Sequence, residues 1–177
     1  MVRVHGRSFV MTLLQSWLTG DIAAGIAGAK ASGREPIYWG GLSPLHLLAQ
    51  RGSVLLVKMA LEAGFDVDAR DDYRRTPLMV AASLAKHLEG GAIAQALLRA
   101  GAAIGTSDLF GNRALHYAAR SGNANAFAAL LAAGADPDAL NHSNCSSRAF
   151  AESRRDLEIM RLLRRLEFIR GGETNAK

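Results

Sequence analysis

Short apolar stretches recur along this chain with the spacing of amphipathic helices. Three of them place leucine and alanine at i, i+3 and i+4: Leu45, Leu48 and Ala49, then Leu78, Ala81 and Ala82, then Leu115, Ala118 and Ala119. Each is followed by a second stretch with similar spacing: Val57 and Leu61, then Ala94, Leu97 and Leu98, then Ala126, Leu130 and Leu131. This pattern predicts three pairs of helices whose apolar faces form the core.

The helix pairs repeat with a nearly constant period. Pro44 and Pro77 lie 33 residues apart, and Gly64, Gly101 and Gly134 are separated by 37 and then 33 residues. An insertion near 85–88 accounts for the longer interval. A fixed period of this size indicates a stacked solenoid.

Turn and cap residues predict where the helices begin and end. Ser43 and Thr76 can cap a first helix, and a proline follows each of them at the first helical position. Gly52 and Gly122 suit the left-handed conformation that ends such a helix. Each helix is then only about two to three turns long, so its stability depends on stacking against neighbours.

The repeated residues resemble those of a known family. The pattern Ser/Thr-Pro-Leu-His-x-x-Ala, a leucine pair and the run AGADPDA (Ala133 to Ala139) resemble the ankyrin repeat over about 41–141. Met79, Arg113 and Arg74 depart from the pattern without breaking the helices. The resemblance implies an all-α repeat solenoid of stacked ankyrin-type helix-turn-helix units joined by β-hairpin-like turns.

We expect a single domain over residues 1–177. Its predicted parts are an N-terminal capping half-repeat at 8–34, repeats at 41–70, 74–107 (with the insertion near 85–88) and 111–140, a C-terminal capping repeat at 144–169, and flexible tails at 1–7 and 171–177.

Composition limits the class of protein. Apolar residues make up 49% of the chain, enough for a core, and the net charge of +5 favours an acidic partner without specifying one. The single cysteine, Cys145, cannot form an internal disulfide, which favours the cytoplasm. Arg3 and Arg7 ahead of the apolar run 9–14 imitate an export signal, the less favoured alternative. No stretch reaches the roughly 18 to 20 apolar residues of a membrane span.

Three groups of residues invite a chemical reading. His46 and His116 could titrate near neutral pH, but the resemblance implies that they hydrogen-bond to neighbouring backbone. His142 and Cys145 place a thiol near an imidazole without a carboxylate to orient it. Four aspartates could indicate a calcium-binding site, although the loops of ankyrin repeats commonly carry aspartate: Asp66, Asp68, Asp71 and Asp72. We expect no catalytic residue, no cofactor and no metal.

Function is therefore sought on the exposed surface. In the first helices, positions offset by two from the core set are expected to line a concave face. The turns between repeats carry aromatic side chains, which often dominate binding energy, although they could instead pack against a neighbouring turn. The predicted partner-binding residues are Tyr38, Trp39, Leu47, Arg51, Asp72, Tyr73, Arg74, Leu84, Leu109, Phe110, Tyr117 and Arg120.

An arginine-rich C-terminal segment is a second candidate surface. It contains Arg148, Arg154, Arg155, Arg161, Arg164, Arg165 and Arg170. Interspersed acidic residues, Glu152, Asp156, Glu158 and Glu167, favour a solvated face over a nucleic-acid site.

The sequence thus predicts a non-catalytic protein-protein interaction module, monomeric apart from its partner. The partner is a protein of unknown identity, and the use is as an inhibitor or immunity partner of an enzyme, or as a scaffold. The alternative is a basic, nucleic-acid-associated regulatory protein.

Overall fold

The computed structural model describes residues 39–84 and 89–174. The predicted half-repeat at 8–34, the tail at 1–7, Tyr38 and the insertion at 85–88 lie outside the described residues. Within them, a short 3-10 helix η1 (Trp39–Gly41) precedes eight α-helices: α3 (Pro44–Arg51), α4 (Val54–Glu62), α5 (Pro77–Ser83), α6 (Gly90–Arg99), α7 (Ala114–Ser121), α8 (Ala124–Ala132), α9 (Ser147–Arg154) and α10 (Leu157–Thr174).

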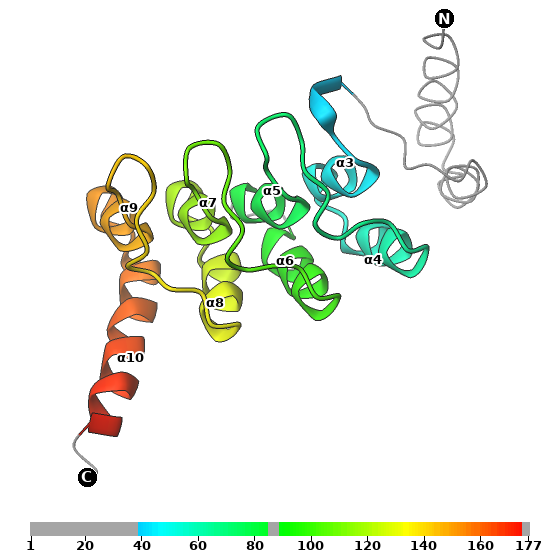
Figure 1. The fold of residues 1–177 in the computed structure, drawn as a ribbon. Coiled ribbons are helices and arrows are strands. Elements are labelled where there is room, and N and C mark those ends of the chain that lie inside the picture. The colour runs from blue at the N-terminus through cyan, green and yellow to red at the C-terminus, as the bar shows by residue number, and fades with distance from the viewer. Residues whose placement is uncertain (1–38, 85–88, 175–177) are drawn as a thin grey trace, which may run out of the picture.

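The helices stack in two rows (Figure 1). The first helices of the pairs, α3, α5, α7 and α9, form one row, and α4, α6 and α8 form the other, with α10 at the end of the array. The described residues contain no strand, only an isolated bridge between Leu140 and Ser146. The predicted all-helical repeat solenoid is therefore confirmed.

Local hydrogen bonds explain several helix starts. The hydroxyl of Thr76 accepts a hydrogen bond from the amide of Met79, and Ser146 does the same for Ala149. At the start of α8, the Asn123 side chain caps the amide of Ala126. Each cap satisfies a first-turn amide that has no partner inside its helix.

The predicted core is confirmed. All nine predicted first-helix core positions are buried, and in the second helices Val57, Ala94, Leu97, Ala126 and Leu130 are buried. Leu61, Leu98 and Leu131 are only partly buried and pack against this core. The small alanines of α5 and α7 let neighbouring repeats approach closely, so the core is continuous along the array.

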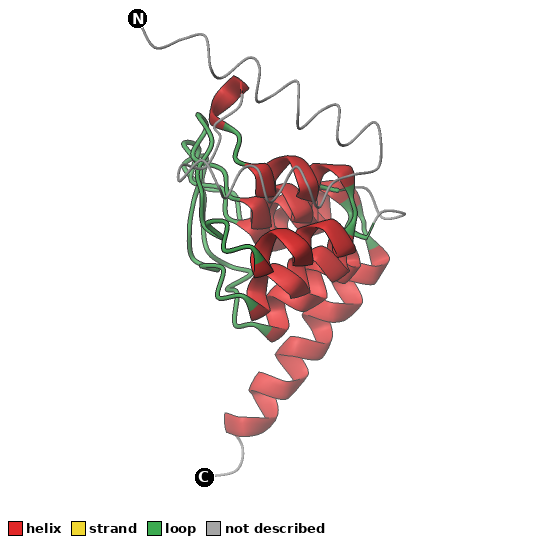
Figure 2. Ribbon diagram, turned by 90° about the vertical axis from the view of Figure 1, so that its right-hand side faces the viewer, coloured by secondary structure: helices red, strands yellow, loops and turns green. Residues whose placement is uncertain are grey.

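The connections from each second helix to the next first helix gather on one side of the helices (Figure 2). They cover residues 63–76, 100–113 and 133–146, and we call them fingers 1, 2 and 3. Because they leave the helical layer on the same side, the residues at their tips are presented together.

Helix α10 is the longest described helix, with 18 residues. It runs to Thr174 and so covers residues 171–174, where the sequence predicts a flexible tail. Helix propagation adds one backbone hydrogen bond per residue, and no proline interrupts it here. None of the described helices is both long and apolar enough to cross a bilayer.

Candidate interaction surface on the finger tips

The tip of each finger is a turn whose backbone amides are hydrogen-bonded by one polar side chain. In finger 1 the Asp71 carboxylate accepts hydrogen bonds from the amides of Tyr73 and Arg75, at 3.0 and 2.7 Å. Asp108 accepts from Phe110 and Asn112 in finger 2, both at 2.8 Å. In finger 3, Asn141 accepts from Ser143 and Cys145, at 2.9 and 3.0 Å. The three turns are therefore built alike, and their backbones are fixed.

Backbone hydrogen bonds join each tip to the next. The amide of Asp72 donates to the carbonyl of Gly40 at 2.9 Å, and the amide of Leu109 donates to Tyr73 at 3.0 Å. The amide of His142 donates to Phe110 at 3.0 Å. The tips thus form one continuous row rather than independent loops.

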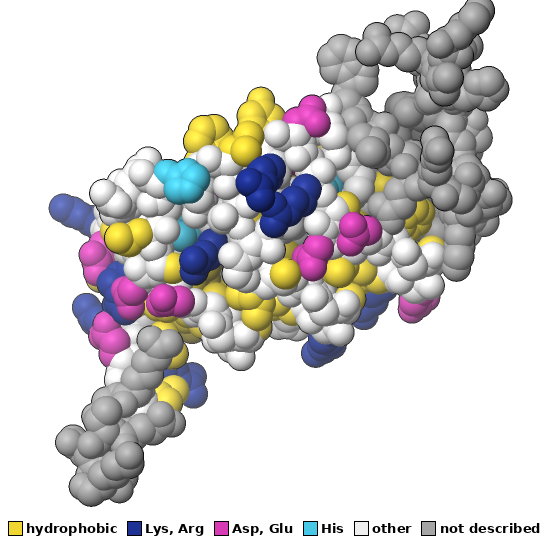
Figure 3. All heavy atoms as spheres, in the orientation of Figure 1, with side chains coloured by type: hydrophobic (Ala, Val, Ile, Leu, Met, Phe, Trp, Pro, Cys, Tyr) yellow, Lys and Arg dark blue, Asp and Glu magenta, His cyan; other side chains and the backbone are white. Residues whose placement is uncertain are grey.

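The central residues of the first two tips project into solvent. Large apolar side chains remain exposed there: 53% of Tyr73, 48% of Leu109 and 59% of Phe110. Asp72 and Arg74 are exposed beside them. We call Asp72, Tyr73, Arg74, Leu109 and Phe110 the finger-tip strip. Figure 3 shows hydrophobic side chains gathered above α5 and α7, where the finger loops lie, with Lys and Arg side chains close by.

Arginines stack on two tyrosines near the tips. The Arg75 guanidinium lies 5.3 Å from the centroid of the Tyr73 ring, and its Nε donates to Asp71 at 2.7 Å. Arg120 lies 5.0 Å from the centroid of Tyr117. The sequence prediction did not include Arg75, although an arginine two residues after a turn tyrosine was the available signal. The stack holds the Tyr73 ring in a defined position.

Tyr117 was expected on the exposed concave face, but the structure buries it. Its side chain is buried, and its hydroxyl donates a hydrogen bond to the Asp108 carboxylate at 2.7 Å. Burial, together with this bond, raises the pKa of Tyr117 well above its usual value. Burial alone would raise the pKa of Asp108, but the hydrogen bonds from Tyr117 and Asn112 hold it below its usual value. Tyr117 therefore braces finger 2 against α7.

Leu84 is the second residue expected on the concave face that the structure buries. It was predicted to face outward, but α5 ends at Ser83, and Leu84 adopts extended backbone and turns into the core. The helical offset that places residues on the outer face no longer applies beyond the last helical residue.

The other predicted site residues fall in separate places. Leu47 is half buried and Arg51 is exposed, both on α3, and Arg120 is exposed on α7. The backbone of Trp39 lies in η1, next to the Gly40 carbonyl that starts the row of finger bonds. The structure brings together the five residues of the finger-tip strip, whereas Leu47 and Arg51 belong to the first-helix row.

The two repeat histidines are hydrogen-bonded to backbone, as the resemblance implied. In His46, Nδ1 accepts from the amide of Ser43 at 3.1 Å, and Nε2 donates to the carbonyl of Arg75 at 2.8 Å. His116 makes equivalent bonds to Arg113 and to the carbonyl of Cys145. Burial lowers the pKa of both histidines, which keeps the neutral form that these bonds need.

The remaining chemical candidates have structural partners. The Cys145 thiol donates weakly to the carbonyl of Ser143, and in the described part of the chain no hydrogen bond joins it to His142. Asp68 accepts a hydrogen bond from the amide of Ala103 in the next finger. Among the described residues, no group of three or more His, Cys, Asp or Glu side chains is placed to hold a metal ion.

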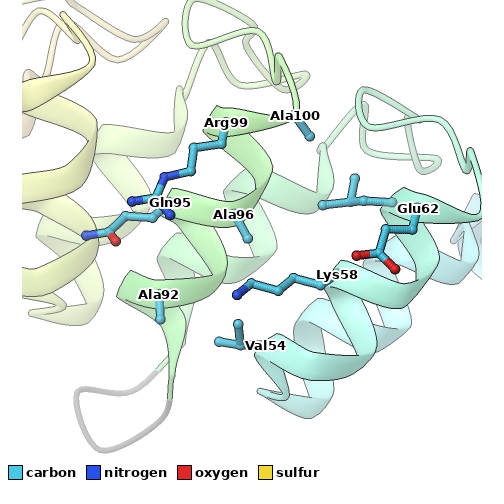
Figure 4. Close-up of a pocket in the computed structure, with 9 residues that line it drawn as sticks. Val54, Lys58, Glu62, Ala92, Gln95, Ala96, Arg99 and Ala100 are labelled. Atoms are coloured by element: carbon cyan, nitrogen blue, oxygen red, sulfur yellow. The ribbon is translucent and has the colours of Figure 1, made fainter.

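A groove of about 360 Å³ lies between α4 and α6 (Figure 4). It is lined by Val54, Lys58, Leu61, Glu62, Ala92, Gln95, Ala96, Arg99 and Ala100. Its three charged side chains, Lys58, Glu62 and Arg99, are all exposed, and most of the other lining residues are apolar. Among the described lining residues, the polar side chains are all exposed, so none of them is a buried group that could orient a small ligand, as a built site normally provides.

Comparison with protein-family models matches residues 45–141 to ankyrin repeats, in three copies. No curated protein matches the chain.

Proposed function

Because the chain belongs to the ankyrin-repeat family, whose repeats are general protein-protein interaction modules, we propose that it binds a protein partner through its finger-tip strip. The observation that carries this proposal is the exposure of Tyr73, Leu109 and Phe110 on a row of hydrogen-bonded turns. Apolar side chains held on rigid backbone lose little conformational entropy when a partner covers them.

The electrostatic setting suits a partner with acidic groups. The strip contains the exposed Arg74 beside the exposed Asp72, and Arg120 is exposed on α7, whereas the carboxylates of Asp71 and Asp108 are buried and already hydrogen-bonded. Exposed guanidinium groups can pair with carboxylates at the rim of an interface.

The backbone of Arg74 adds support. Its φ of 61° lies in the left-handed region. The residues at the same turn position in the next two fingers, Gly111 and Asn144, also have a positive φ. Glycine and asparagine adopt this conformation more easily than arginine does. A residue kept in an unfavourable conformation at an exposed tip is expected when its side chain has a function.

Ankyrin repeats are typically non-catalytic, so the effect on a partner would be exerted by binding. We propose that the protein acts as an inhibitor or immunity partner of an enzyme, and scaffolding is the other use of such a surface. A complex in which the partner keeps its full activity would favour scaffolding.

The test is affinity capture from the native cell with the wild type and a Tyr73→Ala, Leu109→Ala, Phe110→Ala variant. These side chains are exposed, so the variant should keep the helical circular dichroism spectrum. The matched control is Leu55→Ala, because Leu55 is 67% exposed on α4, away from the fingers. We expect a protein retained by the wild type and the control and lost by the triple variant.

The same experiment can contradict the proposal. Equal retention by the folded triple variant would show that the finger-tip strip does not bind the partner. Capture of nucleic acid in place of protein, lost steeply with rising salt, would instead support the nucleic-acid alternative.

A further inference from the structure

The C-terminal helix α10 has a face that nothing in the described structure covers. Its inner face carries Ile159 and Leu163, which are buried against the end of the array. Figure 1 shows that the helix continues well past α8 and α9, away from the two rows. The other described α-helices have 7 to 10 residues, so the 18 residues of α10 exceed what the array can pack against.

A line of side chains runs along the opposite face. Leu157, Arg161, Arg164 and Phe168 stand at i, i+4, i+7 and i+11, and Arg165 flanks them. Leu157 is 68% exposed and Phe168 is 84% exposed, and the three arginines are exposed as well. We call these five residues the cap stripe. At 1.5 Å per residue its two apolar ends are about 16 Å apart.

The arginines of the cap stripe have no acidic partner in the described part of the chain. Arg148 shows the contrast, because its guanidinium pairs with Asp138 and with Glu167, each at 2.6 Å. No ion pair of this kind reaches Arg161, Arg164 or Arg165 among the described residues. The stripe therefore presents three arginines that have no ion-pair partner among the described residues, between two exposed apolar side chains.

The charge decides which occupant fits. A second copy of the chain would bring like charges together, which is unfavourable. A helix that lies on a lipid surface separates its apolar and basic residues onto different faces, whereas here the arginines lie on the same line as Leu157 and Phe168. Carboxylates between two apolar side chains would match this order, because guanidinium groups pair well with carboxylates.

We propose that the cap stripe is a second docking surface, which binds an acidic amphipathic segment of a protein. The segment places large apolar side chains on Leu157 and Phe168 and carboxylates on the three arginines. Covering the stripe also stabilises the projecting part of α10, since a helix without tertiary packing is marginal in water. This surface does not depend on the finger-tip strip.

The probe for the test is a displayed library of random sixteen-residue peptides, selected on the full chain and then measured as synthetic peptides by fluorescence anisotropy. The stripe variant is Arg161→Gln, Arg164→Gln, Arg165→Gln, which removes charge and keeps helix-forming residues. The charge-matched control is Lys58→Gln, Arg70→Gln, Arg99→Gln, at three exposed positions outside the cap.

We expect the selected peptides to combine Asp or Glu with at least two large apolar residues. Their affinity should fall about tenfold or more in the stripe variant, since three charge pairs are lost, and stay unchanged in the control. It should also stay unchanged in the Tyr73→Ala, Leu109→Ala, Phe110→Ala variant, which separates this proposal from the finger-tip proposal.

Three results would overturn the inference. One is a selection that yields no stripe-dependent peptide, and another is stripe-dependent peptides without acidic residues. The third is stripe-dependent binding to phosphatidylcholine and phosphatidylserine vesicles without peptide binding, which would assign the surface to anionic lipid.

Discussion

Arg74 has a backbone conformation that is expected to lower stability, whereas its side chain is proposed to bind the partner. Its left-handed conformation, φ 61°, is the one that Gly111 adopts at the same turn position in finger 2. We predict that Arg74→Gly raises the free energy of unfolding by about 1 kcal/mol, because glycine removes the steric strain of a side chain in this region. Urea denaturation measures the change. The same variant should bind the captured partner more weakly.

The converse substitution gives the control for Arg74. At Gly111 a Cβ atom would meet the His142 side chain at 2.6 Å and its backbone nitrogen at 2.8 Å. Gly111→Ala should therefore destabilise the protein. If Arg74→Gly also lowered the stability, the strain argument for Arg74 would fail.

The repeat histidines predict how stability depends on pH. Burial lowers the pKa of His46 and His116 in the folded protein, so the unfolded chain binds a proton first as the pH falls below about 6.5. The unfolding free energy then decreases with falling pH until the folded histidines also protonate, and above about pH 6.5 the effect is absent.

The measurement is the urea-unfolding free energy at a series of pH values for the wild type and for His46→Met, His116→Met. Met79 shows that methionine fits this repeat position, where it is buried in α5. The variant loses buried hydrogen bonds and should be less stable throughout, but its pH dependence between about pH 6.5 and pH 5 should be shallower. An unchanged slope would show that other groups cause the pH dependence.

At the scale of elements, one cap ties two repeats together. The Asn123 side chain accepts from the amide of Ala126 at the start of α8 and donates to the carbonyl of Leu84 just after α5. The residue is almost fully buried. It therefore fixes both the first turn of α8 and the end of α5.

We predict that Asn123→Ala lowers the unfolding free energy by about 2 kcal/mol, because it removes a cap and leaves two backbone groups without their partner. Thermal and urea unfolding measure the loss. The control is Asn125→Ala two residues later, where the side chain is exposed and a change below about 0.5 kcal/mol is expected. Equal effects at both positions would contradict the role of the cap.

At the scale of the whole molecule, the array presents two surfaces with different construction. The finger-tip strip sits on turns joined by backbone hydrogen bonds, and neighbouring repeats contribute to it jointly. The cap stripe belongs to one helix at the end of the array. An array of this kind can thus expose candidate binding residues at its tips and at its end without altering the core.

Much of this architecture follows from the sequence alone. The period of apolar residues, the Ser/Thr-Pro starts and the repeated glycines predicted the helices and their core, because each is a local preference repeated in every unit. The exposure of Tyr73, Leu109 and Phe110 agrees with their positions in predicted turns. The binding role of these residues stays a prediction.

Only the tertiary structure decided which residues near the tips are free to meet a partner. Tyr117 and Leu84 have sequence positions typical of the outer face, yet one is held by Asp108 and the other turns into the core after α5 ends. The sequence pattern also did not predict the row of hydrogen bonds between tips or the stacking of Arg75 on Tyr73. Local sequence determined the elements through backbone and burial preferences, whereas these contacts depend on where neighbouring repeats stop and how closely their fingers approach.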